Sequence, residues 1–203
     1  MIKQMKLQAT PDDSRYIPFT QQASCCVPTC FQMIMYKNGI PLLPAEEIGY
    51  HLGLIVRPER AGLFYKVRTS EEKPPAGYGT RIYLPEFEPN TAFKNLDIPL
   101  RLKIKPISEI GDSEKLINTL SEIEANNTDA LLCFNHGVLV DDREKDWGHV
   151  VVFDRVVGDK IRIIDPSPEH PKWRLVSVDK IFEAMNRHGE KRSGGVWLID
   201  TVD

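Results

Sequence analysis

The chain has 203 residues, of which 41% are hydrophobic and 27% charged, and its net charge is −3. This balance is typical of one globular domain that buries a core without disulfide or metal staples. The weak, interspersed charge argues against nucleic-acid binding, which usually requires a basic stripe, and no apolar run is long enough to cross a bilayer. Because the N-terminal residues also lack the apolar stretch of a signal peptide, we expect a cytoplasmic protein that binds neither nucleic acid nor membrane. The composition carries no indication of oligomeric state.

Helices are expected in the first part of the chain. After an irregular lead-in, the apolar spacing predicts a helix over residues 26–38, with Pro28 in its first turn, and a second helix over 45–52. Residues 57–110 are rich in Pro and Gly until a strand-like alternation begins at Leu100. We interpret this stretch as an insertion of loops and short helices that shapes a cleft within a single domain of residues 1–203.

Strands are expected mainly in the second part. A strand over 100–107 precedes an amphipathic helix that begins at Asp112 or Ser113, and a buried strand follows at 130–134. The strongest β signal is a hairpin around Val157-Gly158-Asp159. A short helix over 178–187 and a strand over 195–200 complete the order. Helices first and strands later predict an α+β fold, with an N-terminal helix packed on an antiparallel β-sheet.

Three of the four cysteines, Cys25, Cys26 and Cys30, fall within six residues of one another. In a reducing compartment this clustering points to chemistry or metal binding rather than to structural disulfides. Structural zinc sites usually show paired Cys-x-x-Cys knuckles, which this chain lacks. We therefore expect neither a metal nor another cofactor, and a nucleophilic thiol is the preferred interpretation.

Cys26 stands where the first helix is expected to begin. The partial positive charge and free N–H groups of a helix N-terminus favour a thiolate, which is the reactive form of cysteine. The backbone N–H of the same residue can serve as one donor to an oxyanion, and a side-chain amide usually supplies the second. Gln21 and Gln22 lie just upstream, and either amide could turn back over Cys26.

His149 and Asp165 lie at the two outer ends of the predicted hairpin. Antiparallel pairing brings these ends together, so the carboxylate of Asp165 is expected to accept the imidazole Nδ1–H of His149 and to fix its tautomer. His149 would then present its other nitrogen to Cys26 across a cleft between helix and sheet. A Cys/His pair that is distant in sequence and close in space is what nucleophilic catalysis needs.

Four segments carry a resemblance to a known family. Residues 17–39 and 147–182 resemble the bacteriocin-processing peptidases, which cleave double-glycine leaders and have a papain-like fold; the chain looks like a free-standing member. The matching segments are Ile17-Pro-Phe-Thr-Gln21, Cys26-Val-Pro-Thr-Cys30, Trp147-Gly-His149 and Ile163-Ile-Asp165-Pro166. The resemblance implies that Cys26 is the nucleophile, Gln21 the oxyanion glutamine, His149 the base and Asp165 its orienting carboxylate.

Other residues remain as second choices for these roles. Gln22 is the alternative amide. Cys30, one helical turn after Cys26, is followed by an aromatic residue, as the nucleophile of papain is, and is the alternative thiol. Trp147 either lines the cleft or anchors the sheet. His136 is interpreted as a loop residue rather than as a base.

The residues and the resemblance together predict a thiol hydrolase that cleaves a peptide or another amide bond through an acyl-enzyme, with a peptide or protein as substrate. An acyl or peptidyl transferase would use the same triad. A non-catalytic papain-like domain that binds peptides or proteins is the rival from another class. Val27 motivates this rival, because the family commonly has glycine after the nucleophile.

Overall fold

The computed structural model describes residues 11–62, 64 and 73–202. Within these residues six strands form one sheet in the order β1-β6-β2-β3-β4-β5, and every neighbouring pair is antiparallel. The strands are β1 (Leu100–Pro106), β2 (Asp129–Asn135), β3 (Gly148–Val157), β4 (Lys160–Ile164), β5 (Trp173–Ser177) and β6 (Gly195–Thr201). The predicted antiparallel sheet is therefore confirmed.

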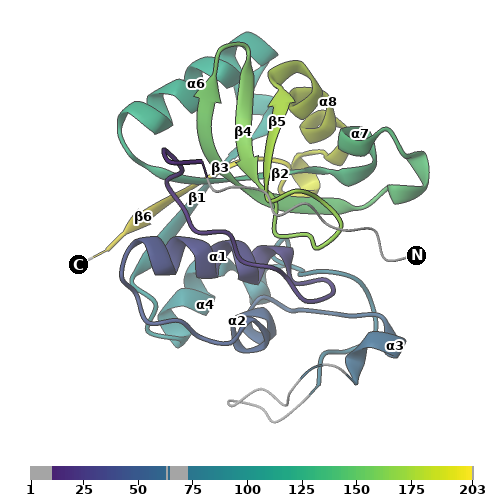
Figure 1. Ribbon diagram of the computed structural model, residues 1–203. Coiled ribbons are helices and arrows are strands. Elements are labelled where there is room, and N and C mark those ends of the chain that lie inside the picture. Colours follow the sequence, from purple (N-terminus) through teal and green to yellow (C-terminus); the bar gives the residue numbers. More distant parts are fainter. Residues whose placement is uncertain (1–10, 63, 65–72, 203) are drawn as a thin grey trace.

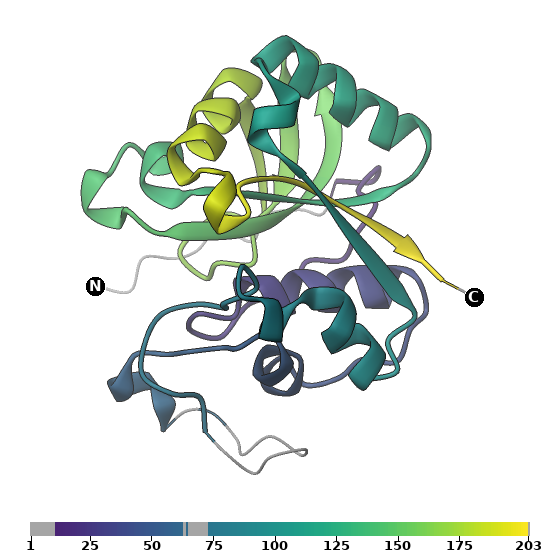
Figure 2. The same cartoon turned by 180° about the vertical axis from the view of Figure 1, so that it is seen from behind.

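Helices cover both faces of this sheet (Figure 1). On one face lie α1 (Cys26–Lys37), α2 (Ala45–His51) and α4 (Pro89–Asn95), and on the other α6 (Ser113–Ala125), α7 (His136–Val140) and α8 (Val178–His188). The view from behind shows β1 and β6, which pair antiparallel, with β6 ending at the C-terminus (Figure 2). Shorter elements are α3 (Pro58–Ala61), α5 (Ile107–Ile110) and the 3-10 turns η1 (Pro85–Phe87), η2 (Arg143–Lys145) and η3 (Glu190–Arg192).

The core is divided in two by the alternation of side chains along the strands. In β2, Leu131 and Cys133 pack into the cluster that contains α1, whereas Leu132 and Phe134 pack with α6 and α8. Successive side chains of a strand point to opposite faces, so one fully buried strand serves both halves. This arrangement explains why the strand at 130–134 reads as a continuous apolar run in the sequence.

The first helix is buried almost all round, as a helix that is apolar on every side should be. Its buried residues include Val27, Phe31 and Ile34, and α1 packs against β3. Pro28 sits in the first turn, where its missing N–H costs no hydrogen bond. Asn38 caps the C-terminal end of the helix, and Gly39, with a φ of +67°, then turns the chain. The prediction of a helix from Cys26 is confirmed, and its first residue lies at the edge of the buried core.

Several elements escaped prediction. β5 lies in a Pro-rich stretch, and α7 is too short to show a helical period; it begins because the Asn135 side chain accepts a hydrogen bond from Val138 N–H. The stretch 57–110 holds the expected short helices, but its last part forms β1 and so belongs to the sheet. The interpretation of this stretch as an insertion stays a prediction.

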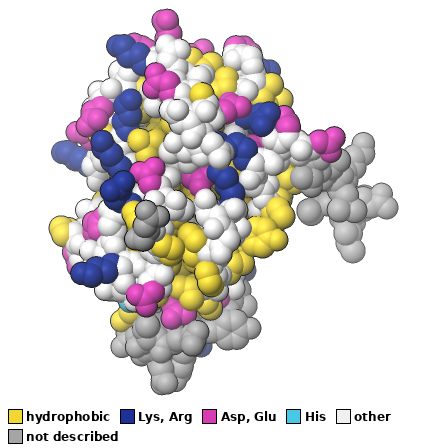
Figure 3. Space-filling view, turned by 90° about the vertical axis from the view of Figure 1, so that its left-hand side faces the viewer, with side chains coloured by type: hydrophobic (Ala, Val, Ile, Leu, Met, Phe, Trp, Pro, Cys, Tyr) yellow, Lys and Arg dark blue, Asp and Glu magenta, His cyan; other side chains and the backbone are white. Residues whose placement is uncertain are grey.

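The surface mixes charges of both signs. Figure 3 shows the side of the molecule that lies on the left in Figure 1. Lys and Arg side chains are interspersed with Asp and Glu over its upper half, and hydrophobic side chains gather below them. None of the helices in the described ranges combines the length and the apolar character that crossing a membrane requires.

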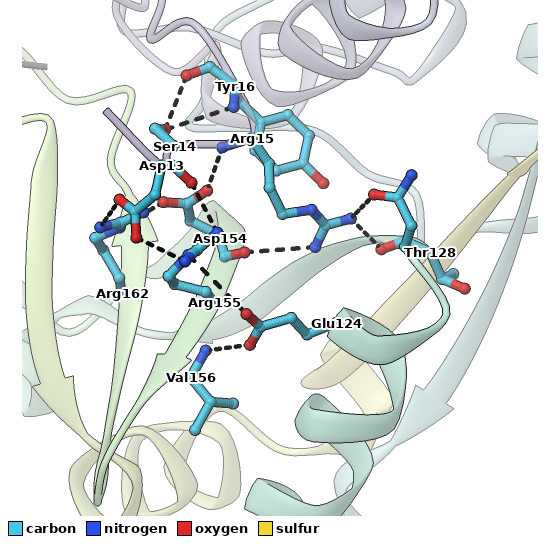
Figure 4. Close-up of polar contacts among 11 residues, drawn as sticks. Asp13, Ser14, Arg15, Tyr16, Glu124, Thr128, Asp154, Arg155, Val156 and Arg162 are labelled. Carbon is cyan, nitrogen blue, oxygen red and sulfur yellow. Dashed lines mark hydrogen bonds and ion pairs between the residues drawn. The ribbon is translucent and has the colours of Figure 1, made fainter. Parts of the chain in front are cut away.

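The segment that leads to α1, residues 11–20, is fastened to the β3–β4 hairpin by charged side chains (Figure 4). Asp154 is fully buried; its carboxylate pairs with Arg162 at 2.5 Å and accepts the backbone N–H of Arg15 at 2.9 Å. Asp13 bridges Arg162 and Arg155, at 2.8 and 2.6 Å. Because a buried carboxylate is tolerated only with partners, these contacts fix where the segment crosses the hairpin.

Candidate active site

The two adjacent cysteines at the start of α1 differ in their exposure to solvent. The chain turns at the buried Ser24, whose φ of 66° lies in the left-handed region, and Cys26 is the first residue of α1. Cys25 is fully buried in a small cluster with Leu54 and Val56, and burial raises the pKa of its thiol. Cys26 is partly exposed. As the first helical residue it also has a backbone N–H without an acceptor inside the helix.

Cys26 opens into a cleft that His149 shares. A hollow of about 640 Å³ is lined by Cys26 and His149, and a neighbouring hollow of about 370 Å³ continues it past His149. Six residues line both hollows: Gln21, Ser24, Arg57, Tyr78, Trp147 and His149. We refer to the two hollows together as the cleft. The thiol and the imidazole therefore face one continuous opening, between the tip of α1 and the start of β3.

His149 and Asp165 contact each other, as the hairpin predicts, but through the other ring nitrogen. Nε2 of His149 lies 2.8 Å from Oδ1 of Asp165, and both side chains are buried. The expectation that Nδ1 would face the carboxylate is wrong. Asp165 follows β4, out of register with His149, and neighbouring strands lie about 4.8 Å apart. Nε2, the nitrogen farther from the backbone, spans that gap and therefore meets the carboxylate.

His149 and Asp165 each stabilise the charged form of the other. Burial by itself lowers the pKa of His149, but hydrogen bonds with Asp165 and with Cys26 outweigh it and raise the pKa to about 10. Burial raises the pKa of Asp165, but His149 and the N–H of Ser167 lower it, so that it lies well below its usual range. At neutral pH the site holds an imidazolium between a carboxylate and a sulfur atom, which is the arrangement that nucleophilic thiol chemistry requires.

The loop that carries Asp165 is held from several sides. Oδ2 of Asp165 accepts a hydrogen bond from Arg174 at 2.9 Å. The ammonium of Lys172 lies 3.0 Å from the carbonyl oxygens of both Pro166 and Ser167. These contacts surround the carboxylate with donors and cations, so its position and its negative charge are both fixed.

Gln21 is tied to the same loop. Its backbone N–H donates to the carbonyl oxygen of Pro166 at 2.9 Å, and its side chain lines both parts of the cleft. The amide oxygen of Gln21 is buried and has no hydrogen-bond partner among the described residues. The amide of Gln22, by contrast, donates to Glu46 at 2.8 Å, so this second candidate is engaged elsewhere.

Cys30 and Trp147 differ in their access to the cleft. Cys30 is fully buried, its thiol donates to the carbonyl oxygen of Val150 at 3.4 Å, and burial raises its pKa well above the ordinary value. Trp147 lines the cleft, and its ring stacks on that of His136 with centroids 5.5 Å apart. Of the Cys26 and Cys30 thiols, it is Cys26 that lines the cleft, and Trp147 is part of the wall.

His136 is not the loop residue that its sequence context suggested. It is the first residue of α7, buried, and its ring meets the His149 ring edge-on with centroids 5.1 Å apart. Burial, followed by the nearby His149 and His170, lowers its pKa to about 3, so it is neutral at physiological pH. The signal that could have located it is its place after β2, since β2 pairs with β3 and sets Phe134 opposite His149.

Tyr78 was also missed, because nothing in its Gly-rich surroundings marks it as a cleft residue. Its ring lies 5.7 Å from that of Trp147, and burial raises its pKa to about 12. As for metals, no group of three or more His, Cys, Asp or Glu side chains within the described ranges is arranged to hold an ion.

Comparisons with known proteins bear on the fold. The sequence matches no protein-family model and no curated protein. Among solved structures, the chain is similar to the crystal structure of a candidate C39-like peptidase from Bacillus anthracis, with a TM-score of 0.56 and 15% sequence identity. The match covers 95% of this chain and 100% of that one. The predicted papain-like α+β fold is therefore confirmed as the fold of a C39-like peptidase, while membership of the bacteriocin-processing group stays a prediction.

Proposed function

We propose that this protein is a thiol hydrolase that cleaves a peptide or another amide bond, with Cys26 as nucleophile, His149 as acid and base, and Asp165 as the carboxylate that orients His149. The observation that carries the proposal is the buried imidazole of His149, which is hydrogen-bonded to Asp165 and lines the same cleft as the partly exposed thiol of Cys26. The C39-like fold adds support, because the similar structure is described as a candidate peptidase.

The geometry supports a two-step reaction. The Cys26 thiolate attacks the carbonyl carbon, and the oxyanion that forms accepts hydrogen bonds from the Cys26 backbone N–H and the Gln21 amide. As the C–N bond breaks, His149 gives its proton to the leaving amine, and a thioester remains on Cys26. His149, now neutral, then takes a proton from water as the water attacks the thioester, and the C–S bond breaks.

Asp165 acts through His149 rather than on the substrate. It holds Nε2 at 2.8 Å and thereby leaves Nδ1 as the nitrogen that would exchange a proton with Cys26. Its negative charge, kept by the contacts with Ser167 and Arg174, stabilises the imidazolium before attack. Transfer of the acyl group to an amine or thiol instead of water would use the same residues, and product analysis with added amines separates the two outcomes.

A domain that only binds peptides is the rival, since Val27 follows the nucleophile where glycine is common in the family. Val27 is buried, and it lies on the wall of the cleft. A binding module has no need for a buried carboxylate–imidazole pair that shares a cleft with a thiol. The burial of two charged groups is costly, and that cost is offset only by their mutual pairing. These features favour the enzyme.

Alkylation tests the proposal without knowledge of the substrate. We expect iodoacetamide at pH 7 to modify Cys26 at least about 10-fold faster than Cys25, Cys30 or Cys133, because these three are buried. Fragment-ion mass spectrometry of the digest locates the label, and a Cys25→Ser variant separates the adjacent thiols. The matched controls are Cys26→Ala, which should lose the fast label, and Cys30→Ala, which should keep it.

Labelling that persists in Cys26→Ala and disappears in Cys30→Ala would show that the nucleophile has been assigned to the wrong thiol. Equal, slow labelling of Cys26 and of a cysteine in an unfolded peptide would favour the binding module.

A further inference from the structure

The cleft is cationic although the chain as a whole is acidic. The net charge of the protein is −3. The described residues that line the cleft nevertheless include five cationic side chains and two acidic ones. The cationic ones are Arg57, Arg60, Arg81, Lys191 and Arg192, and the acidic ones are Asp146 and Glu169. Their distribution differs from the interspersed charges on the face in Figure 3.

The two acidic residues do not neutralise this excess. Asp146 accepts a hydrogen bond from the Asn135 amide at 2.7 Å and lies 3.5 Å from the guanidinium of Arg187. Glu169 pairs with Lys145 at 3.6 Å. Each acid thus has a cationic partner outside the cleft; Asp146 also interacts electrostatically with Arg192, but neither acid forms an ion pair with Arg57 or Arg60.

Two of the cations are free to bind a ligand. Arg57 and Arg60 are exposed, and neither forms an ion pair with any residue in the described ranges. Arg57 lies over the ring of Tyr78, with its guanidinium carbon 5.7 Å from the ring centroid. Arg81 differs, because its Nε donates to the carbonyl oxygen of Gly53 and its guanidinium covers Phe87.

The position of Arg57 connects this charge to the candidate nucleophile. Arg57 lines both parts of the cleft, the part that contains Cys26 and the part that contains Arg60. A peptide bound across Cys26 would run past Arg57. Guanidinium groups bind carboxylates through two parallel hydrogen bonds, and stacking on an aromatic ring holds the guanidinium in place for this contact.

We propose that the substrate is an acidic peptide, whose Asp or Glu side chain close to the cleaved bond is bound by Arg57 and Arg60. This inference rests on the proposed function and specifies its substrate class. Tyr78 and Trp147 supply an apolar wall for the peptide, while the two arginines select its charge. Because the contact is partly exposed, added salt should weaken it.

The test uses short peptides with a carboxy-terminal electrophile that traps Cys26. A glutamate is placed at each of the three positions next to the electrophile in turn, and each peptide is compared with its glutamine counterpart. For at least one position we expect the glutamate probe to modify Cys26 about 10-fold faster, and we expect 0.5 M salt to reduce this preference.

Paired variants identify the source of the preference. Arg57→Gln with Arg60→Gln should abolish the preference, so that the glutamate and glutamine probes modify Cys26 at equal rates. Arg101→Gln with Lys94→Gln removes the same charge outside the cleft and should keep the preference. Equal rates for glutamate and glutamine in the wild-type protein, or a preference that survives loss of both arginines, would overturn the inference.

This result is separable from the proposed function. Iodoacetamide has no carboxylate for the two arginines to bind, so fast labelling of the wild-type protein together with equal probe rates rejects only the acidic substrate. Loss of the fast iodoacetamide label in the wild-type protein would instead reject the thiol hydrolase.

Discussion

The two walls of the cleft are built differently. One wall consists of β3 and the loop after β4, where Asp165 has three hydrogen-bond partners and Lys172 binds the loop carbonyls. The other wall comes from the described residues within 54–62 and 73–83, which contain the short helix α3 and two isolated bridges, Ile55↔Gly79 and Val56↔Ala76, but no strand of the sheet. The first wall is called the hairpin wall and the second the loop wall.

This difference indicates a division of labour. Proton transfer depends on distances held within a fraction of an ångström, so its groups belong on rigid elements. Substrate selection tolerates looser geometry and is commonly carried by loops on a rigid scaffold. We therefore expect changes in the hairpin wall to affect the chemical step, and changes in the loop wall to affect binding.

The largest effect is expected from His149→Ala. Removal of the acid–base group takes away the proton for the leaving amine and the partner of the Cys26 sulfur, so kcat/KM should fall by about 10³-fold or more. The measurement is turnover of a peptide substrate. His51→Ala, a histidine outside the cleft, is the control and should leave turnover within about twofold. Retention of wild-type turnover in His149→Ala would refute the role of His149.

The second largest effect is expected from Asp165→Asn, which should lower kcat by about 10²-fold or more and change KM little. The amide keeps the shape of the carboxylate but not the charge that stabilises the imidazolium. Asp141→Asn, which removes an exposed carboxylate paired with Lys180, is the matched control. If Asp165→Asn raised KM and left kcat intact, Asp165 would belong to substrate binding and the division between the walls would fail.

Tyr78→Ala tests the loop wall. Loss of its ring removes the surface on which Arg57 rests and a neighbour of Trp147, so KM should rise about 10-fold while kcat stays within about threefold. Steady-state kinetics with a peptide substrate measure both constants. Tyr36→Ala, an exposed tyrosine outside the cleft, controls for loss of a surface ring. A fall in kcat comparable with that of Asp165→Asn would show that the loop wall takes part in the chemical step.

The smallest effect concerns stability and pH. The pKa of His149 is raised to about 10, so its pairing contributes fully below the ordinary value of 6.5 and is lost as the pH rises through 10. The free energy of unfolding should therefore fall more steeply between pH 6 and pH 9 in the wild-type protein than in His149→Gln. Urea titrations at both pH values measure the difference.

Equal pH slopes in the two proteins would mean that His149 is not charged in the folded state. Asp165 gives the opposite dependence: its lowered pKa contributes stability above the ordinary value of 3.8, which is lost as the pH falls below it.

The hairpin wall could be predicted from the sequence, whereas the loop wall could not. Val157-Gly158-Asp159 marks the turn, and antiparallel pairing then brings His149 and Asp165 together without further information. The choice of ring nitrogen failed because it depends on the offset between the strands, which includes an irregularity between Phe153 and Arg155. Such an offset leaves no trace in the hydrophobic pattern.

Residues such as Tyr78 and His136 were missed for another reason. Tyr78 lies in a segment with isolated bridges, where no period relates sequence to position. His136 is buried by contacts with Trp147 and His170, which are distant in sequence, and a five-residue helix gives no periodic signal. Tertiary contacts determine the place of Tyr78, whereas for His136 the position directly after β2, which pairs with β3, was the one usable signal.

The most direct measurement of the central claim is the capture of the covalent intermediate. The protein is mixed with a short peptide thioester, quenched in acid during turnover, and analysed by intact mass and by fragment ions. We predict one acyl group on Cys26, which accumulates further when Asp165→Asn slows its release and is absent in Cys26→Ala. An acyl group on Cys30, or turnover that continues in Cys26→Ala, would contradict the account.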